Sequence, residues 1–214
     1  MIDNKGTMEV TPGVNYINDW RDGNGRYVLD KIISNGKVII NKVVTGCGFT
    51  TYSLCNKIDT ILVSPRLKLI LNKMEQFNKD EPLCYYFNRE KGYDGKQKTI
   101  DELENEFTLY QYECKQNQRP LKILVTYDSF CTLASMLERY GIDISKKFNI
   151  TVDESHCLIK DIKLKEYNNK SVLSTFIDRL FRYKNVLFIS ATPIIDYMQE
   201  IEHFRNNHVS YYEL

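Results

Sequence analysis

Short apolar segments rich in Val, Ile and Leu alternate along the chain with longer segments in which apolar residues recur at helical spacing. Continuous apolar runs of only a few residues are typical of strands buried on both faces of a parallel sheet. Strands that alternate with helices predict an α/β domain built from right-handed βαβ units. The predicted strands are residues 38–44, 60–63, 121–125, 148–152 and 186–189, with 83–87 as a candidate sixth. The predicted helices are residues 50–57, 65–77, 99–116, 129–140 and 169–183.

Composition limits the partners that the whole molecule can attract. The 214 residues suffice for one sizeable domain, and 43% hydrophobic with 27% charged residues is ordinary for a globular protein. The formal net charge is +1, so the molecule has no global field that favours a nucleic acid. Any binding of nucleic acid therefore needs a local patch.

The cysteines and the hydropathy pattern bear on the compartment. No two of the six cysteines have CxxC spacing, and none lies in a Cys/His cluster with zinc-ligand spacing, so we expect reduced thiols. The first residues lack the apolar core of a signal peptide, and no apolar run approaches the roughly 18 residues of a membrane span. We expect a cytoplasmic protein with no membrane partner, in the host cytoplasm if a phage or mobile element encodes it.

Polar residues capable of chemistry follow every one of the five main predicted strands. In open parallel sheets, ligands bind outside the carboxyl ends of the strands, so these residues should meet at one edge of the sheet. In chain order the segments are Thr45-Gly46-Cys47-Gly48-Phe49-Thr50-Thr51, Ser64-Pro65-Arg66, Thr126-Tyr127-Asp128-Ser129, Asp153-Glu154-Ser155-His156 and Ser190-Ala191-Thr192-Pro193.

Taken in order, these segments resemble the motifs of superfamily 2 (DEAD/DEAH-box-like) helicases and translocases. TGCGFTT resembles the Walker A loop, SPR motif Ia, TYDS motif Ib, DESH the DEAH box and SATP the SAT motif. Each segment alone has a simpler interpretation, namely a glycine turn, a solvated loop start or a helix cap. Their common order and their positions at strand ends favour the resemblance. It implies a three-layer RecA-like P-loop NTPase domain with a central, mainly parallel sheet, which binds ATP or another NTP together with Mg²⁺.

The resemblance also implies roles for individual residues. The backbone of the loop would cradle phosphates, and Thr50 and Asp153 would hold Mg²⁺. Glu154 would orient and deprotonate the attacking water. The residues expected to bind the nucleotide are Thr45, Gly46, Cys47, Gly48, Phe49, Thr50 and Thr51. The expected catalytic residues are Glu154, Asp153 and His156, and Ser190 and Thr192 would couple the DESH segment to conformational change. The residues expected to contact the backbone of a bound nucleic acid strand are Pro65, Arg66, Thr126 and Tyr127.

The loop departs from the family pattern at Phe49, which stands where the family has a lysine. That lysine donates charge-assisted hydrogen bonds to the β- and γ-phosphates, so nucleotide binding should be weakened, and hydrolysis more so. Lys42, near the end of the preceding strand, is a candidate substitute, and Phe49→Lys should then restore binding in a protein that lacks Lys42. The alternative for Lys42 is a structural ion pair with an acid on a flanking helix, or a head group that reaches water.

The motif positions predict the domain organisation and the partners. Residues 1–36 form a lead-in segment, residues 37–207 form the first RecA-like domain, and residues 208–214 begin a linker to an absent second domain. In this family, nucleotide lies between two RecA-like domains, so the expected partners are a second such domain, in cis or in trans, and single- or double-stranded nucleic acid. The isolated chain should be inactive as an ATP hydrolase.

Two other functions compete with a helicase-like ATPase. A catalytically inactive pseudo-ATPase, kept as a nucleic-acid- or protein-binding module, is favoured by Phe49 but leaves Glu154 without a purpose. A P-loop nucleotide kinase would leave the DESH and SATP segments unexplained.

Overall fold

The structure, a computed structural model, describes residues 2–34, 36–42, 45–79, 83–91, 96–158, 172–192 and 201–214. Its strands are β1 (Ile2–Thr7), β2 (Lys37–Asn41), β3 (Thr60–Ser64), β4 (Tyr85–Tyr86), β5 (Glu90–Lys91), β6 (Lys96–Gln97), β7 (Lys122–Thr126), β8 (Asn149–Val152), β9 (Val186–Ser190) and β10 (Val209–Glu213). Its helices are the 3₁₀ turn η1 (Ile17–Asp19), α1 (Val28–Ile33), α2 (Phe49–Cys55), α3 (Leu67–Phe77), α4 (Ile100–Gln116), α5 (Tyr127–Arg139), α6 (Ile144–Lys147), α8 (Val172–Leu180) and α10 (Glu202–Asn206).

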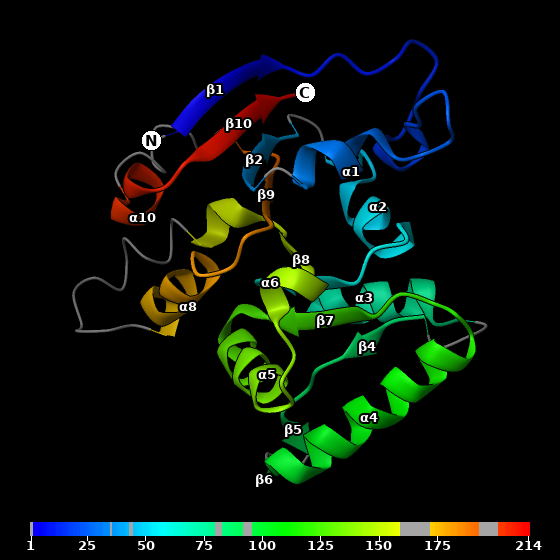
Figure 1. Cartoon of the computed structure of the whole chain (residues 1–214), viewed down its shortest axis with the longest axis vertical. Helices are drawn as coiled ribbons and strands as arrows, with labels where there is room; N and C mark the ends of the chain where they lie inside the picture. The colour runs from blue at the N-terminus through cyan, green and yellow to red at the C-terminus, as the bar shows by residue number, and fades with distance from the viewer. Residues whose placement is uncertain are drawn as a thin grey trace.

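One eight-stranded sheet in the order β1-β10-β2-β9-β8-β3-β7-β4 organises the fold. All of its ladders are parallel, and β5 and β6 form a separate antiparallel ribbon. Helices α1, α2 and α3 lie on one face of the sheet, and α5, α8 and α10 lie on the other (Figure 1). The predicted fold class, a three-layer α/β domain around a parallel sheet, is confirmed, and this arrangement is consistent with a RecA-like fold.

Strict alternation along the strands divides the core between the two faces. In β2, Ile39 packs with the cluster that contains α5 and α8, whereas its neighbour Ile40 packs with α1, α2 and the N-terminal segment. In β3, Ile61 and Leu62 are divided in the same way. Successive side chains of a strand point to opposite faces, so a continuous apolar run supplies both layers. This is why the central strands were recognisable in the sequence.

The predicted helices begin and end close to the expected residues. Thr99 caps α4 through a capping box with Glu102, and the acidic first turn suits that helix start. Helix α5 ends just before Gly141, which has a φ of 72°. Within the described ranges, no helix combines the length and the apolar character that crossing a bilayer requires.

The two ends of the chain differ from the sequence-based domain boundaries. Residues 208–214 do not begin a linker, because Val209–Glu213 is strand β10, which pairs with β2 on one side and β1 on the other. Residues 1–36 are not only a lead-in, because Ile2–Thr7 is the edge strand of the same sheet. The sequence concealed both strands for a physical reason: β1 has the polar composition of an edge strand, and β10 mixes Ser and Glu with apolar residues and so lacks the continuous apolar run of the central strands.

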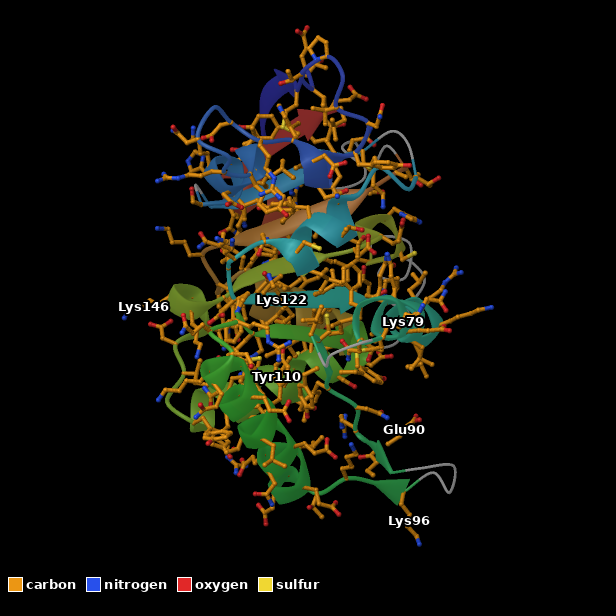
Figure 2. All side chains as sticks on the ribbon, turned by 90° about the vertical axis from the view of Figure 1, so that its right-hand side faces the viewer. Lys79, Glu90, Lys96, Tyr110, Lys122 and Lys146 are labelled. Atoms are coloured by element: carbon orange, nitrogen blue, oxygen red, sulfur yellow. The ribbon has the colours of Figure 1, made fainter. Side chains whose placement is uncertain are left out.

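A buried lysine lies at the other end of the sheet from the predicted site. Figure 2 shows Lys122 within the body of the molecule, whereas Lys96 projects from its outline. The Lys122 ammonium donates to Asn56 Oδ1 at 2.6 Å, and three further oxygens lie within hydrogen-bonding distance of it. These are Ile58 O at 2.7 Å, Ser53 O at 3.0 Å and Thr60 Oγ1 at 3.2 Å. The cage ties the end of α2 to the start of β3. Burial disfavours the charged ammonium and lowers the pKa of Lys122 to about 8.

This pKa predicts a pH-dependent contribution to stability. Between about pH 8 and the ordinary pKa of 10.5, the unfolded chain binds more protons at Lys122 than the folded chain does, so wild-type stability rises with pH in that window. Relative to Lys122→Met, the unfolding free energy of the wild type should gain roughly 3 kcal/mol from pH 7 to pH 10.5. Urea unfolding of both proteins at several pH values measures the difference. A pH-independent difference would contradict the lowered pKa.

Candidate functional site

The parallel sheet brings the five polar segments to one edge. Backbone hydrogen bonds fix their relative positions: Lys42 N donates to Ser190 O at 2.7 Å, and Asp153 N donates to Val63 O at 2.9 Å. The ends of β2, β9, β8 and β3 are therefore held in register, as the sequence predicted. Residues 43 and 44 and residues 193–200, which include Pro193 of the SATP segment, lie outside the described residues.

The glycine-containing loop after β2 is shaped by the N-terminal segment. Gly46 and Gly48 have φ angles of 77° and 94°, a region that favours glycine. A Cβ atom on Gly48 would collide with the side chain of Asn18. Ile17 N also donates to Cys47 O at 2.8 Å. The 3₁₀ turn η1 therefore packs directly against this loop.

Phe49 has a packing role in this arrangement. It is only 2% exposed and belongs to an apolar cluster with Ile17, Trp20, Ile40 and Tyr52. The sequence analysis placed Phe49 in the nucleotide-binding set because of its position in the loop. Its side chain instead joins the N-terminal segment to the central sheet, and it carries no charge that a phosphate could use.

Thr50, Asp153, Glu154 and Lys42 form a connected polar group in the middle of the edge. Thr50 Oγ1 donates to Asp153 Oδ2 at 3.3 Å. Lys42 Nζ lies 3.0 Å from Glu154 Oε1 and 3.6 Å from Asp153 Oδ1. Lys42 therefore pairs with the two acids of the site, and not with an acid on a flanking helix.

Burial sets the electrostatics of this group. Lys42 and Asp153 are 6% and 8% exposed. Burial is the largest influence on Asp153 and raises its pKa, while the Lys42 ammonium opposes that rise. Burial also disfavours the Lys42 ammonium, but the attraction of Asp153 and Glu154 outweighs it and raises the pKa of Lys42. At neutral pH the lysine is thus a buried counter-charge.

Tyr127 holds the backbone of the acidic pair. Its hydroxyl donates to Asp153 O at 2.6 Å and to Glu154 O at 3.3 Å, and its ring stacks on Phe176. Glu154 has a φ of 49°, which is uncommon for a residue with a side chain, so this backbone needs support. The sequence analysis assigned Tyr127 to nucleic-acid contact. The Tyr127 side chain is only 4% exposed and its hydroxyl is bound to the acidic pair, which speaks against that assignment.

His156 connects the acidic pair to the loop after β9. Its Nδ1 lies 3.1 Å from Ser190 Oγ and 3.2 Å from Glu154 Oε2. Ser190 Oγ in turn donates to Thr192 O at 2.9 Å and accepts from Thr192 N at 3.0 Å. Any movement of the loop after β9 would therefore be transmitted to His156 and Glu154.

Three cavities adjoin these residues. One of about 120 Å³ is lined by the loop from Gly46 to Thr51 together with Lys42 and, from helix α3, Lys73. A cavity of about 170 Å³ shares Lys42 and Cys47 with it and is lined mainly by the N-terminal segment. A third, of about 240 Å³, is lined by the DESH segment and by Pro65 and Arg66. Its residues are Pro65, Arg66, Leu69, Glu154, His156 and Cys157.

A larger cavity, of about 500 Å³, lies elsewhere. Asp59, Leu121 and Lys147, which line it, come just before β3, β7 and β8, so it opens at the amino ends of the strands. Ligands of parallel sheets bind at the carboxyl ends, and none of the motif residues lines this cavity. We therefore place the candidate site at the smaller cavities.

The residues that could hold a metal ion are few. No group of three or more His, Cys, Asp or Glu side chains suited to a metal ion occurs in the part of the chain that the structure describes. Mg²⁺ in phosphate-transfer sites needs only one or two protein oxygens, because phosphates and water supply the rest. The Thr50 hydroxyl and the Asp153 carboxylate, 3.3 Å apart, fit that requirement.

Sequence reasoning missed two features of this edge. The hydrogen bonds of Tyr127 to the acidic pair cross between two strand ends, and no local pattern indicates them. Lys73 lies in an amphipathic helix, where a lysine is ordinarily part of the solvated face. Neither feature has a signal in a single sequence.

Comparison with known proteins does not assign the chain to a family. No protein-family model matches the chain, and a search of curated proteins finds no significant match. The functional argument therefore rests on the geometry of the edge.

Proposed function

We propose that this chain is the first, nucleotide-binding domain of a superfamily 2 helicase-like ATPase that acts on nucleic acid. One observation carries the proposal: Thr50, Asp153, Glu154, His156 and Ser190 come from three separate strand ends, yet they form one continuous hydrogen-bonded group. A solvated loop start or a helix cap needs no such connection, so the simpler interpretations of the separate motifs lose support.

In this proposal each side chain has a distinct task. Thr50 and Asp153 hold Mg²⁺, which neutralises charge on the transferring phosphoryl group when it is bound. Glu154 accepts a proton from the attacking water, and His156 and Ser190 relay the state of the acidic pair to the loop after β9. Tyr127 fixes the carbonyl groups on which the acidic pair depends.

Lys42 takes the part of the missing loop lysine. Its ammonium lies among the acids of the site, and its side chain also lines the loop cavity, so one lysine joins the acids to the loop. Bound Mg²⁺ would provide a second counter-charge for Asp153, and the long side chain of Lys42 would then be able to turn toward the phosphates. The cation needed for phosphate binding thus comes from the strand and not from the helix.

Nucleic acid and a second domain complete the proposal. Pro65 and Arg66 border the cavity beside Glu154 and His156, and Arg66 is exposed, so a strand that contacts them would lie next to the catalytic acids. Half-buried Thr126, at the end of β7, belongs to the same edge. A second RecA-like domain, in cis or in trans, would supply the arginine that stabilises the transferring phosphoryl group.

The competing function is a pseudo-ATPase that binds nucleic acid or protein. A specific observation favours it: the loop cavity of about 120 Å³ is smaller than the ~300–1,000 Å³ of usual ligand pockets, and the ammonium of Lys42 already pairs with both acids. In that case the polar group would be a structural remnant that stabilises the edge.

Binding of a fluorescent ATP analogue with and without Mg²⁺ tests the two functions. The wild type should bind the analogue in a Mg²⁺-dependent way, and Asp153→Asn should weaken binding about tenfold or more. Glu154→Gln should retain binding, because the proposed role of Glu154 is to activate the water and not to hold the nucleotide. Turnover by the chain alone should be negligible. No binding by a folded wild-type protein would favour the pseudo-ATPase, and equal binding by Asp153→Asn would remove the proposed metal site.

A further inference from the structure

The loop cavity has two cations, and only one of them is committed to the acids. Lys42 Nζ lies within 3.6 Å of both carboxylates of the acidic pair. Lys73, on α3, lines the same cavity, and its Nζ donates to Gln76 Oε1, a neutral partner one helical turn away, at 3.2 Å. No carboxylate among the described residues forms an ion pair with Lys73.

The chain connection explains why a residue of α3 reaches this loop. Helix α2 follows the loop and leads to β3, and α3 follows β3, so the two helices lie next to each other on the same face of the sheet (Figure 1). Thr50 and Thr51 of α2 therefore share a cavity with Lys73 of α3. Lys73 is half-buried, and its ammonium lies 3.2 Å from Gln76 Oε1 and 5.9 Å from the centroid of the Phe77 ring. The long, flexible stem of a lysine would let this charged end swing toward an anion in the cavity that Lys73 lines.

The charge balance of the cavity favours an anion. Its lining holds two lysines and no acidic residue, and the side chain of Phe49 contributes no charge. When Lys42 remains with the acids, Lys73 is the cation that an incoming anion can attract without exposing a buried carboxylate. When Lys42 turns away, Lys73 adds a second positive charge on the other side of the loop.

We propose that Lys73 is a phosphate-binding residue which supplies, from the neighbouring helix, charge that the loop itself lacks. This inference rests on the proposed nucleotide site and extends it: the cavity takes the polyphosphate end of a nucleoside triphosphate between Lys42 and Lys73. Lys73 contributes to affinity for the phosphate chain and does not discriminate among bases.

Equilibrium titrations of the full chain with Mg²⁺·ATP analogue and, separately, with Mg²⁺·tripolyphosphate test the proposal. Lys73→Met should weaken binding of both probes about tenfold or more, since a charge-assisted hydrogen bond to phosphate is lost. Lys73→Arg should keep most of the affinity. Lys68→Met, which removes an exposed lysine of the same helix that does not line the cavity, is the matched control and should bind as the wild type does.

The outcomes separate this inference from the proposed function. If the wild type binds both probes and Lys73→Met binds them equally well, the role of Lys73 is overturned and the nucleotide site stands. No binding of either probe by the wild type overturns both. An equal loss in Lys68→Met would show a general effect of surface charge and would also overturn the role of Lys73. Should Lys73→Met melt at a lower temperature than the wild type, Lys73→Gln, which keeps a polar end without charge, decides in its place.

Discussion

Replacing Phe49 with lysine should destabilise the protein by about 4 kcal/mol or more and should not restore a phosphate-binding loop. Phe49 is 2% exposed among Ile17, Trp20 and Tyr52, so the substitution removes a buried ring and forces an ammonium either into an apolar cluster or out through it. Either outcome removes the apolar packing that holds η1 to the loop and leaves mainly the hydrogen bond from Ile17 N to Cys47 O. Urea unfolding and binding of the ATP analogue measure the two parts of this prediction.

A conservative change separates packing from charge at this position. Phe49→Leu keeps an apolar side chain and should cost only about 1–2 kcal/mol, with the N-terminal segment still in place. If Phe49→Lys were as stable as Phe49→Leu and bound the ATP analogue more tightly than the wild type, the loop would be a phosphate loop with one altered residue. The packing interpretation of Phe49 would then be wrong.

Removing the charge of Lys42 should have the second large effect. Lys42→Met leaves Asp153 and Glu154 side by side in a buried place without a counter-charge, and loss of one partner of a buried ion pair costs about 3 kcal/mol or more. Nucleotide binding should fall about tenfold or more as well, because the proposed substitute cation is gone.

The loss of stability in Lys42→Met should depend on pH in a defined direction. Burial already raises the folded-state pKa of Asp153, and without Lys42 it rises further. The folded variant then keeps a proton that the unfolded chain loses near the ordinary pKa of 3.8, so its stability falls as pH rises through this range. The difference in unfolding free energy between Lys42→Met and the wild type should be small near pH 4. It should reach its full value once Asp153 is ionised in the folded variant.

A second substitution isolates the pair interaction. Glu154→Gln in the Lys42→Met background removes one of the two uncompensated acids and should recover part of the lost unfolding free energy, whereas Glu154→Gln alone should not stabilise the protein. Additive effects of the two substitutions would mean that Lys42 and Glu154 do not interact in solution. The account of Lys42 as a counter-charge would then fail.

The sequence predicted the central part of the fold because local and global signals agree there. The apolar runs that became β2, β3, β7, β8 and β9 are buried on both faces, and parallel pairing then brings their carboxyl ends together whatever the side-chain details. The proximity of Thr50 to Asp153 follows from that topology. The roles of Phe49 and Tyr127 could not be predicted, since both depend on which side chain fills a space made by distant segments.

The role of Lys42 could be predicted only in part. A lysine in a buried strand needs a partner, and the sequence indicated as much, but it could not identify the partner among all the acids of the chain. The partners, Asp153 and Glu154, follow β8. Strand β8 lies two positions from β2 in the sheet, with β9 between them, and this order is what brings the acids within reach of Lys42. The sequence did not indicate strands β1 and β10, because they join the sheet through distant pairing, β10 with β2 and β1 with β10, and not through an apolar composition.

The position of β2 also has a consequence for synthesis of the protein on the ribosome. Lys37 of β2 pairs with Val186 of β9 and with Val209 of β10, so both neighbours of this strand come from the last part of the chain. Ile39 and Ile40 have no sheet partners while the intervening residues are being made, and contacts between such distant segments form slowly. The loop at the end of β2 is therefore among the last parts of the domain to be fixed. Until then the nascent chain presents a bare apolar strand that chaperones would have to shield.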